Sequence, residues 1–164
     1  MYWTNELHAV KGLNNYSKDY LQFTSDLSLL TSFNIPTNFV IATRIGGGIS
    51  TSDVEFFQSL TLGNKNYLRG YRTDRFAGTA RLYGNLELRI KLFDFQSYIV
   101  PGIVGLTVFN DVGRVWYKNE SSSTWHYGYG GGIYFSPANL LLITATVGIS
   151  KESVMPGFSI GFRF

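Results

Sequence analysis

The segment Arg81-Leu82-Tyr83-Gly84-Asn85-Leu86-Glu87-Leu88-Arg89-Ile90-Lys91-Leu92 alternates between apolar and polar residues over its whole length. Its even-numbered positions are leucine, isoleucine or glycine, and its odd-numbered positions are tyrosine, asparagine or charged. A helix would mix these two sets, whereas a β-strand separates them completely. The pattern favours a membrane strand with lipid on one side and a wet lumen on the other. An amphipathic strand over a soluble core also fits, although this segment is long for one.

The composition of the chain points to the same class. Of its 164 residues, 45% are hydrophobic, 16% are aromatic and only 15% are charged, and the mean hydropathy is +0.01. A soluble domain usually carries about 25% charged residues. Many aromatic residues and few charges, without a long apolar run, are typical of a transmembrane β-barrel. A soluble β-sandwich is the alternative.

Several other classes of protein and site are disfavoured. No stretch approaches the roughly 20 apolar residues of a membrane helix, and no basic cluster with interleaved aromatic residues indicates nucleic acid as a partner. The chain has no cysteine, and its two histidines are isolated. No serine–histidine–acid pattern indicates a hydrolase. We therefore expect no metal, no cofactor and no catalytic residue. Residues 1–6 lack the features of a signal peptide, so an exported protein would be a mature or trimmed form.

The alternation predicts eight strands within a single domain, residues 1–164. Their expected bounds are 1–12, 18–32, 37–50, 79–93, 98–112, 124–136, 139–150 and 155–164. Short connections at 34–37, 94–97 and 136–139 alternate with longer ones at 14–16, 51–78, 117–124 and 151–154. Outer-membrane barrels alternate short periplasmic turns with longer outer loops in this way. We predict an all-β, antiparallel transmembrane β-barrel with eight strands per chain.

The longest connection contains an arginine, and one predicted strand contains an aspartate; an ion pair between the two would account for both. Arg69 lies in the run Asn66-Tyr67-Leu68-Arg69-Gly70-Tyr71, and Asp111 lies on the lumen face of the strand 98–112. A charge inside a barrel needs a partner, and arginine can form a bidentate pair with a carboxylate. We predict that the extracellular loop 51–78 folds inward and that Arg69 pairs with Asp111, assisted by Glu87. A solvated Arg69 is the alternative.

These motifs resemble those of a known family. The run from Leu62 to Tyr71 is similar to the sixth-loop signature of the outer-membrane assembly and secretion superfamily. That superfamily contains BamA-like insertases, two-partner secretion transporters and the bacterial surface antigen family. Phe109-x-Asp111-x-Gly113 resembles its second signature, and Glu87 lies in a segment that resembles its intervening strand. The alternating residues Phe158, Ile160, Phe162 and Phe164 resemble its C-terminal assembly signal.

The resemblance implies the C-terminal half of a barrel that has sixteen strands in that family. The chain would be a short form without the periplasmic POTRA domains. Three arrangements fit: a trimmed half, two copies that pair into a larger barrel, or a small barrel whose loop lies outside. A closed eight-stranded barrel has an interior just wide enough for its own side chains, so it could not hold the loop 51–78. A homodimer is therefore favoured over a monomer.

The resemblance also implies a function. The protein would be a non-enzymatic barrel of the bacterial cell outer membrane that inserts polypeptides into that membrane or translocates them across it. Outer-membrane lipids and polypeptide clients would be its partners. Its functional motif would comprise Arg69, Gly70, Tyr71, Glu87, Phe109, Asp111 and Gly113. A lipid-acting enzyme of the phospholipase type and a passive pore or anchor are the alternatives.

Deletion of Phe164 tests the C-terminal signal. The deletion removes one aromatic anchor, which contributes about 1.5–3 kcal/mol through burial of its apolar area, together with the recognition end. We expect the variant to be depleted from the outer membrane, as measured by membrane fractionation. Normal levels of the variant in that membrane would show that Phe164 is not part of a signal.

Overall fold

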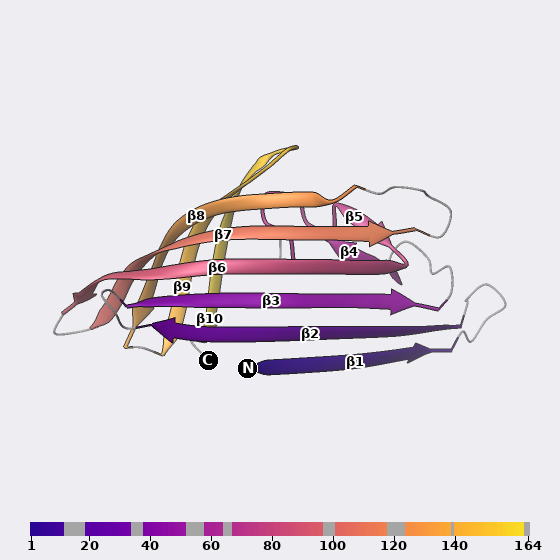
Figure 1. The fold of residues 1–164 in the computed structure, drawn as a ribbon, viewed down its shortest axis with the longest axis horizontal. Helices are drawn as coiled ribbons and strands as arrows, with labels where there is room; N and C mark the ends of the chain where they lie inside the picture. The colour runs from indigo at the N-terminus through magenta and orange to yellow at the C-terminus, as the bar shows by residue number, and fades with distance from the viewer. Residues whose placement is uncertain are drawn as a thin grey trace.

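An open, curved β-sheet forms the molecule in the computed structural model (Figure 1). The structure describes residues 1–11, 19–33, 38–51, 58–63, 67–96, 101–117, 124–138 and 140–162. Eight antiparallel strands lie in the order β1-β2-β3-β6-β7-β8-β9-β10, and a separate hairpin, β4–β5, is inserted in the chain between β3 and β6. In the described part of the chain, no helix is long and apolar enough to cross a membrane.

All eight predicted strands are present. The bounds of the strands are β1 (Tyr2–Val10), β2 (Tyr20–Phe33), β3 (Phe39–Ser50), β4 (Leu60–Leu62), β5 (Phe76–Gly78), β6 (Ala80–Phe95), β7 (Gly102–Trp116), β8 (His126–Pro137), β9 (Leu141–Ser150) and β10 (Val154–Phe162).

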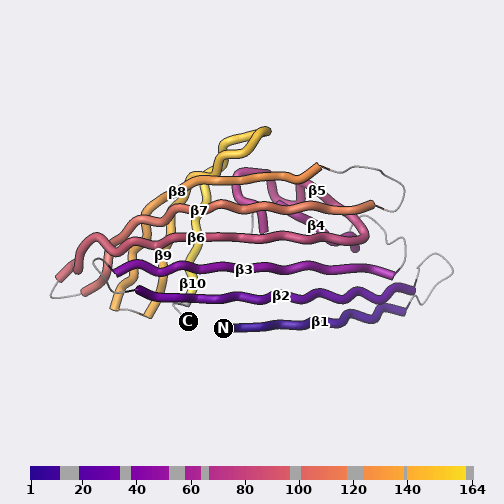
Figure 2. Tube along the Cα trace, viewed as in Figure 1, coloured from indigo at the N-terminus to yellow at the C-terminus, as the bar shows by residue number. Residues whose placement is uncertain are grey.

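The sheet bends back on itself along β8 (Figures 1 and 2). The strands β1, β2, β3, β6 and β7 run side by side in this view, and beyond the bend of β8 the strands β9 and β10 run across them. A cavity of about 800 Å³ lies in the concave space. Ser28 and Arg44 line it from β2 and β3, and Thr144, Thr146 and Ser159 line it from β9 and β10. The polar faces of the strands therefore look into a shared lumen.

The alternation of faces is clearest in β7. Gly105, Thr107, Phe109, Asp111 and Gly113 are buried on the concave side, while Leu106, Val108 and Asn110 between them are exposed. The burial of β8 follows the same period of two. Lumen and outer faces therefore fall as the sequence predicts.

The structure differs from the sequence-based predictions in three respects: one strand end, one hairpin and one shift in strand pairing. The strand β7 continues past its expected end at residue 112 and reaches Trp116. Gly113 lies within the strand, and a Cβ atom there would lie 3.0 Å from the side chain of Leu62 in the hairpin. The hairpin β4–β5 itself was not predicted, since strands of three residues leave no readable alternation. The pairing of β6 with β7 shifts between Lys91 and Phe93, so Leu92 is an extra residue that ends the strict alternation.

Some expectations lie outside the described residues. These are the connections 14–16 and 34–37, residues 97–100 and 139 at two other turns, residues 118–123, parts of the loop at 52–57 and 64–66, and Arg163 and Phe164 with the side chain of Phe162.

The seam of the predicted barrel is open. Among the described residues, β1 pairs only with β2, and β10 pairs only with β9. The long loop lies on the concave side, against β6, β7 and β9. The strand order and faces of a barrel are thus present without closure within one chain.

The outer face can be tested at Val108, near the middle of β7. Val108 is 54% exposed and lies between Leu88 of β6 and Gly131 of β8. A charged residue on the lipid face of a barrel costs about 2–4 kcal/mol at the bilayer midplane, so Val108→Arg should lower the free energy of unfolding in urea–liposome titrations by that amount. Val108→Leu is the matched control. Equal stability of the two variants would mean that this face contacts water.

Candidate functional site

The loop between β3 and β6 is anchored by its own small apolar cluster. Leu60, Leu62, Leu68 and Tyr71 are all buried. The hairpin β4–β5 contacts β6 and β7. Burial of these side chains against the sheet holds the loop on the concave face, as predicted for a loop that folds inward.

Gly70 lets the loop pass very close to β9. Its φ angle is +91°, a conformation that favours glycine. A Cβ atom at this position would lie 2.8 Å from the backbone carbon of Ile149. The carbonyl oxygen of Gly70 accepts hydrogen bonds from the hydroxyls of Ser150 and Ser153, at 2.7 and 2.9 Å. A glycine is therefore required here for two reasons, the angle and the space.

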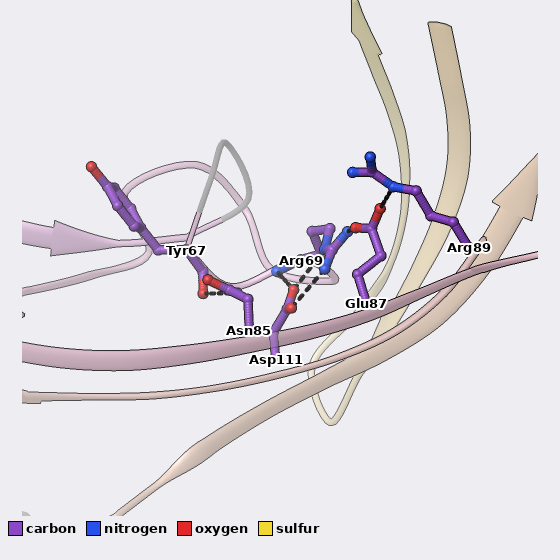
Figure 3. Close-up of polar contacts among 6 residues, drawn as sticks. All are labelled: Tyr67, Arg69, Asn85, Glu87, Arg89 and Asp111. Atoms are coloured by element: carbon purple, nitrogen blue, oxygen red, sulfur yellow. Dashed lines mark hydrogen bonds and ion pairs between the residues drawn. The ribbon is translucent and has the colours of Figure 1, made fainter. Parts of the chain in front are cut away.

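The neighbouring residue, Arg69, forms the predicted pair with Asp111 (Figure 3). Its Nε and Nη2 atoms donate to the two carboxylate oxygens of Asp111, both at 2.8 Å. The backbone N–H of Arg69 also donates to Asp111, at 3.0 Å. The Asp111 side chain has no solvent exposure. A buried carboxylate that lacked these donors would carry a large desolvation cost, so the loop and β7 depend on each other here.

Glu87 connects this pair to a second arginine. One of its carboxylate oxygens accepts from Arg69 Nη1 at 2.5 Å, and the other accepts from Arg89 Nε at 2.7 Å (Figure 3). Burial lowers the pKa of the Arg69 guanidinium, but the hydrogen bonds and negative charges of Asp111 and Glu87 outweigh burial and hold that pKa above its ordinary value. Two arginines and two acids thus balance their charges within the lumen.

The two aromatic residues of the motif take different places. Phe109 lies under the cluster, with its ring centre 3.6 Å from the guanidinium carbon of Arg69. This geometry is a cation–π contact. Tyr71 packs edge-on against Phe76 and donates a hydrogen bond to the carbonyl oxygen of Tyr127, at 3.3 Å. Tyr71 therefore attaches the loop to β8, and Phe109 supports the ion pair.

A second lumen cluster was not identified from the sequence. Tyr83, only 1% exposed, donates a short hydrogen bond to Asp26, which also accepts from Arg44 Nε at 3.0 Å. The ring of Tyr67, in the loop, lies beside Tyr83 with ring centres 4.5 Å apart. Asp26, Arg44 and Tyr83 each lie on the lumen side of a predicted strand, and this position is the signal in the sequence that could have indicated the cluster. The registers that bring three strands together could not be read from alternation.

The loop also reaches the hairpin β9–β10 through exposed residues. Arg75 forms an ion pair with Glu152, with Nε and Oε2 2.7 Å apart. The ring of Phe76 stacks on His126 at the start of β8, with ring centres 3.7 Å apart. His126, which the sequence left isolated, is thus a packing residue at the loop. Within the described ranges, no cluster of three histidine, aspartate or glutamate side chains could hold a metal ion.

The residues of the expected C-terminal signal lie apart from this site. Phe158 and Ile160 lie on the outer face of β10 and are 70% and 62% exposed. Their position on the outer face of β10 agrees with the alternation in the sequence. Their role in assembly stays a prediction.

Replacement of Arg69 by alanine tests the ion pair. The change leaves Asp111 buried without its donors, and breaking a buried pair typically costs about 3–5 kcal/mol. We expect faster cleavage of the loop by protease and altered heat-modifiability on gels, with the strand signal in circular dichroism retained. The double variant Arg69→Ala, Asp111→Asn removes the orphaned charge and should recover part of the loss. Cleavage and gel mobility unchanged in Arg69→Ala would refute the pairing.

Comparisons with known proteins agree with this geometry. No curated protein matches the chain significantly. The family model described as the Omp85 superfamily domain matches residues 2–164, which is nearly the whole chain. That superfamily consists of outer-membrane proteins concerned with the insertion and translocation of polypeptides. With its antiparallel sheet and inward loop, the chain belongs to the Omp85 superfamily.

Proposed function

We propose that this chain lies in the outer membrane and helps polypeptides to enter or cross that membrane. Members of its superfamily act as transporters or insertases rather than as enzymes. The observation that carries the proposal is the cluster of Arg69, Asp111 and Glu87, which fixes a long loop inside the lumen beside an open edge. A barrel that served only as an anchor would have no need of either feature.

The open edges supply a binding surface for an extended polypeptide. A strand at the edge of a sheet presents unpaired N–H and C=O groups, and an extended segment can add there by β-augmentation. Pro156 in β10 has no N–H group, and proline within sheets is largely confined to edge strands. A client strand would first pair with such an edge and then leave it as the client completes its own sheet.

The loop connects the middle of the sheet with this edge. Arg69 is bonded to β6 and β7, while the adjacent Gly70 is bonded to the serines at the end of β9 and in the turn before β10. The loop therefore sets how far the hairpin β9–β10 curves over the lumen. In this mechanism the ion pair keeps the β10 edge at a defined position, where a client strand can reach it.

Assisted folding of a client barrel tests the proposal. We expect liposomes that contain this protein to fold an added outer-membrane barrel faster than empty liposomes do, as measured by gel mobility over time. Arg69→Ala should lose most of this acceleration, because the loop no longer fixes the edge. Arg72→Ala, at an exposed position in the same loop, is the matched control and should keep the acceleration.

The same assay separates the alternative functions. A passive pore would release a trapped dye from the liposomes without any effect on client folding. A lipid-acting enzyme would release fatty acids from the detergent-solubilised phospholipid. Either result, together with an unchanged rate of client folding, would contradict the proposed function.

A further inference from the structure

The cavity in the lumen is lined by more positive than negative side chains. Its volume is about 800 Å³, and three arginines line it: Arg44 from β3, Arg69 from the loop and Arg89 from β6. Among the described residues that line it, Glu87 is the single acid. Arg44 and Arg89 lie on inner strands of the sheet, and together they are called the arginine wall below.

The acids beside the arginine wall are already occupied by donors. One oxygen of Glu87 accepts from Arg69 and the other accepts from Arg89. Asp26 accepts from Nε and Nη2 of Arg44, both at 3.0 Å. These carboxylates therefore hold the arginines in place, and they do not use all the donors of the wall.

Both arginines of the wall keep donors for a further acceptor. Arg89 uses Nε for Glu87, and its two Nη atoms make no hydrogen bond within the described part of the chain; Figure 3 shows them directed away from Glu87. Arg44 uses Nε and Nη2 for Asp26, which leaves its Nη1 atom. The Arg89 and Arg44 side chains are 24% and 32% exposed. A guanidinium carries five N–H donors, and those turned into a cavity bond to whatever acceptor enters it.

Another arginine adds positive charge next to this wall. Arg81 of β6 donates to the carbonyl oxygen of Thr61 at 2.9 Å and to the hydroxyl of Tyr67 at 3.4 Å. No acid among the described residues forms an ion pair with Arg81. Because the arginines of the two lumen clusters are matched by as many acids, Arg81 leaves this side of the lumen with a net positive charge.

Hydroxyl groups line the same cavity from other strands. Thr146 lies on β9 and Ser159 lies on β10. Thr146 falls in the same row across the sheet as Arg89, through the paired residues Thr107 and Gly132. A hydroxyl can donate a hydrogen bond to an anion. An anion in the cavity would therefore meet donors from β9 and β10 as well as from the arginine wall.

The depth of the arginine wall limits which anions can reach it. Arg89 stands opposite Thr107, which lies in the central part of β7. Lipid headgroups lie at the two surfaces of a hydrocarbon core about 30 Å thick, and lipids contact the outer face of a barrel. An anion at this depth therefore arrives through the aqueous lumen, either as a solute or as part of a polypeptide.

The spacing of the two arginines favours a polypeptide. Val40 pairs with Arg89, and Arg44 lies four residues further along β3 than Val40. Four residues of a strand span about 13 Å, which is far more than one carboxylate or phosphate group can bridge with hydrogen bonds of about 3 Å. An extended polypeptide covers this span with four residues, and residues four apart in it point to the same side.

We propose that the arginine wall binds two carboxylates of an extended client polypeptide, carried by acidic residues four positions apart. Each guanidinium bonds to one carboxylate, a geometry that suits arginine. This inference rests on the proposed function, because the ligand is the client of that function, and it adds the chemistry by which the client is recognised. The wall lies on β3 and β6, so it leaves the β10 edge free for a client strand.

Binding of synthetic peptides to the refolded chain in detergent micelles tests the proposal. Three fluorescent peptides of serine and glycine carry two glutamates four positions apart, two adjacent glutamates, or two glutamines. We expect the first peptide to bind about tenfold more tightly than either of the others, the size expected for one additional charge-assisted hydrogen bond. Added salt should weaken its binding, because salt screens charges in a wet lumen.

Arg89→Gln is the informative variant. Glu87 keeps its bond to Arg69 in this variant, so the loop stays in place. We expect Arg89→Gln to bind the first peptide about tenfold more weakly, whereas Arg89→Lys, which keeps the charge, should lose less. Arg72→Gln, at an exposed loop position that does not line the cavity, is the matched control and should bind as the wild type does.

Protection of a cysteine in the cavity locates the bound peptide. The chain has no native cysteine, so Thr146→Cys supplies a single thiol in the cavity and Arg72→Cys supplies one outside it. The first peptide should slow the reaction of a water-soluble thiol reagent with Thr146→Cys and leave Arg72→Cys unaffected. Inorganic phosphate at the same concentration should protect Thr146→Cys much less.

Three results would overturn the inference: equal affinity for the three peptides, an equal loss of affinity in Arg89→Gln and Arg72→Gln, or protection by phosphate that equals protection by the peptide. The last result would make the wall a general anion site. The failures of the two proposals are distinguishable because the peptide assay involves no folding. Unassisted client folding with retained peptide selectivity would contradict the proposed function, and assisted folding without that selectivity would contradict the arginine wall as a client site.

Discussion

The buried ion pair between Arg69 and Asp111 is the constraint on which the rest of the structure depends. Asp111 has no exposure to solvent, so its charge must be balanced by donors inside the lumen. The only described donors to its carboxylate come from Arg69, through the side chain and the backbone N–H. The loop must therefore lie inside the curve of the sheet. Its cluster of leucines then adds apolar burial to the same position.

The loop lies across the concave face of the open sheet. The loop lies in the concave space beside a cavity of about 800 Å³, and it bonds the middle strands to the hairpin at the end of the sheet. The curvature is thus set by contacts across the lumen as well as by the strands themselves. A wall of this shape has one lumen and two free edges. The proposed function of the protein follows from those edges.

Much of the fold could be predicted from the sequence because a strand has a period of two. The alternation from Arg81 to Leu92 places Glu87 in the lumen without any knowledge of the neighbours of its strand. The same argument places Asp111 in the lumen, and the need to balance its charge pointed to Arg69 as its partner. The cluster of Tyr83, Asp26 and Arg44 was missed, because alternation gives the face of a strand but not its register against the next strand. The hairpin β4–β5 was missed because it is too short to show a period.

By itself, the sequence determined the number and order of the eight strands of the main sheet, the face that their side chains take, and the pairing of Arg69 with Asp111 and Glu87. These are local properties, since the direction of a side chain follows from its position along the strand. Only the tertiary structure decided which strand positions stand opposite each other, how sharply β8 bends, and that Gly70 passes against the backbone of β9. It also decided that β1 and β10 do not pair with each other among the described residues, because the separation of the two end strands is a property of the whole wall rather than of any single segment.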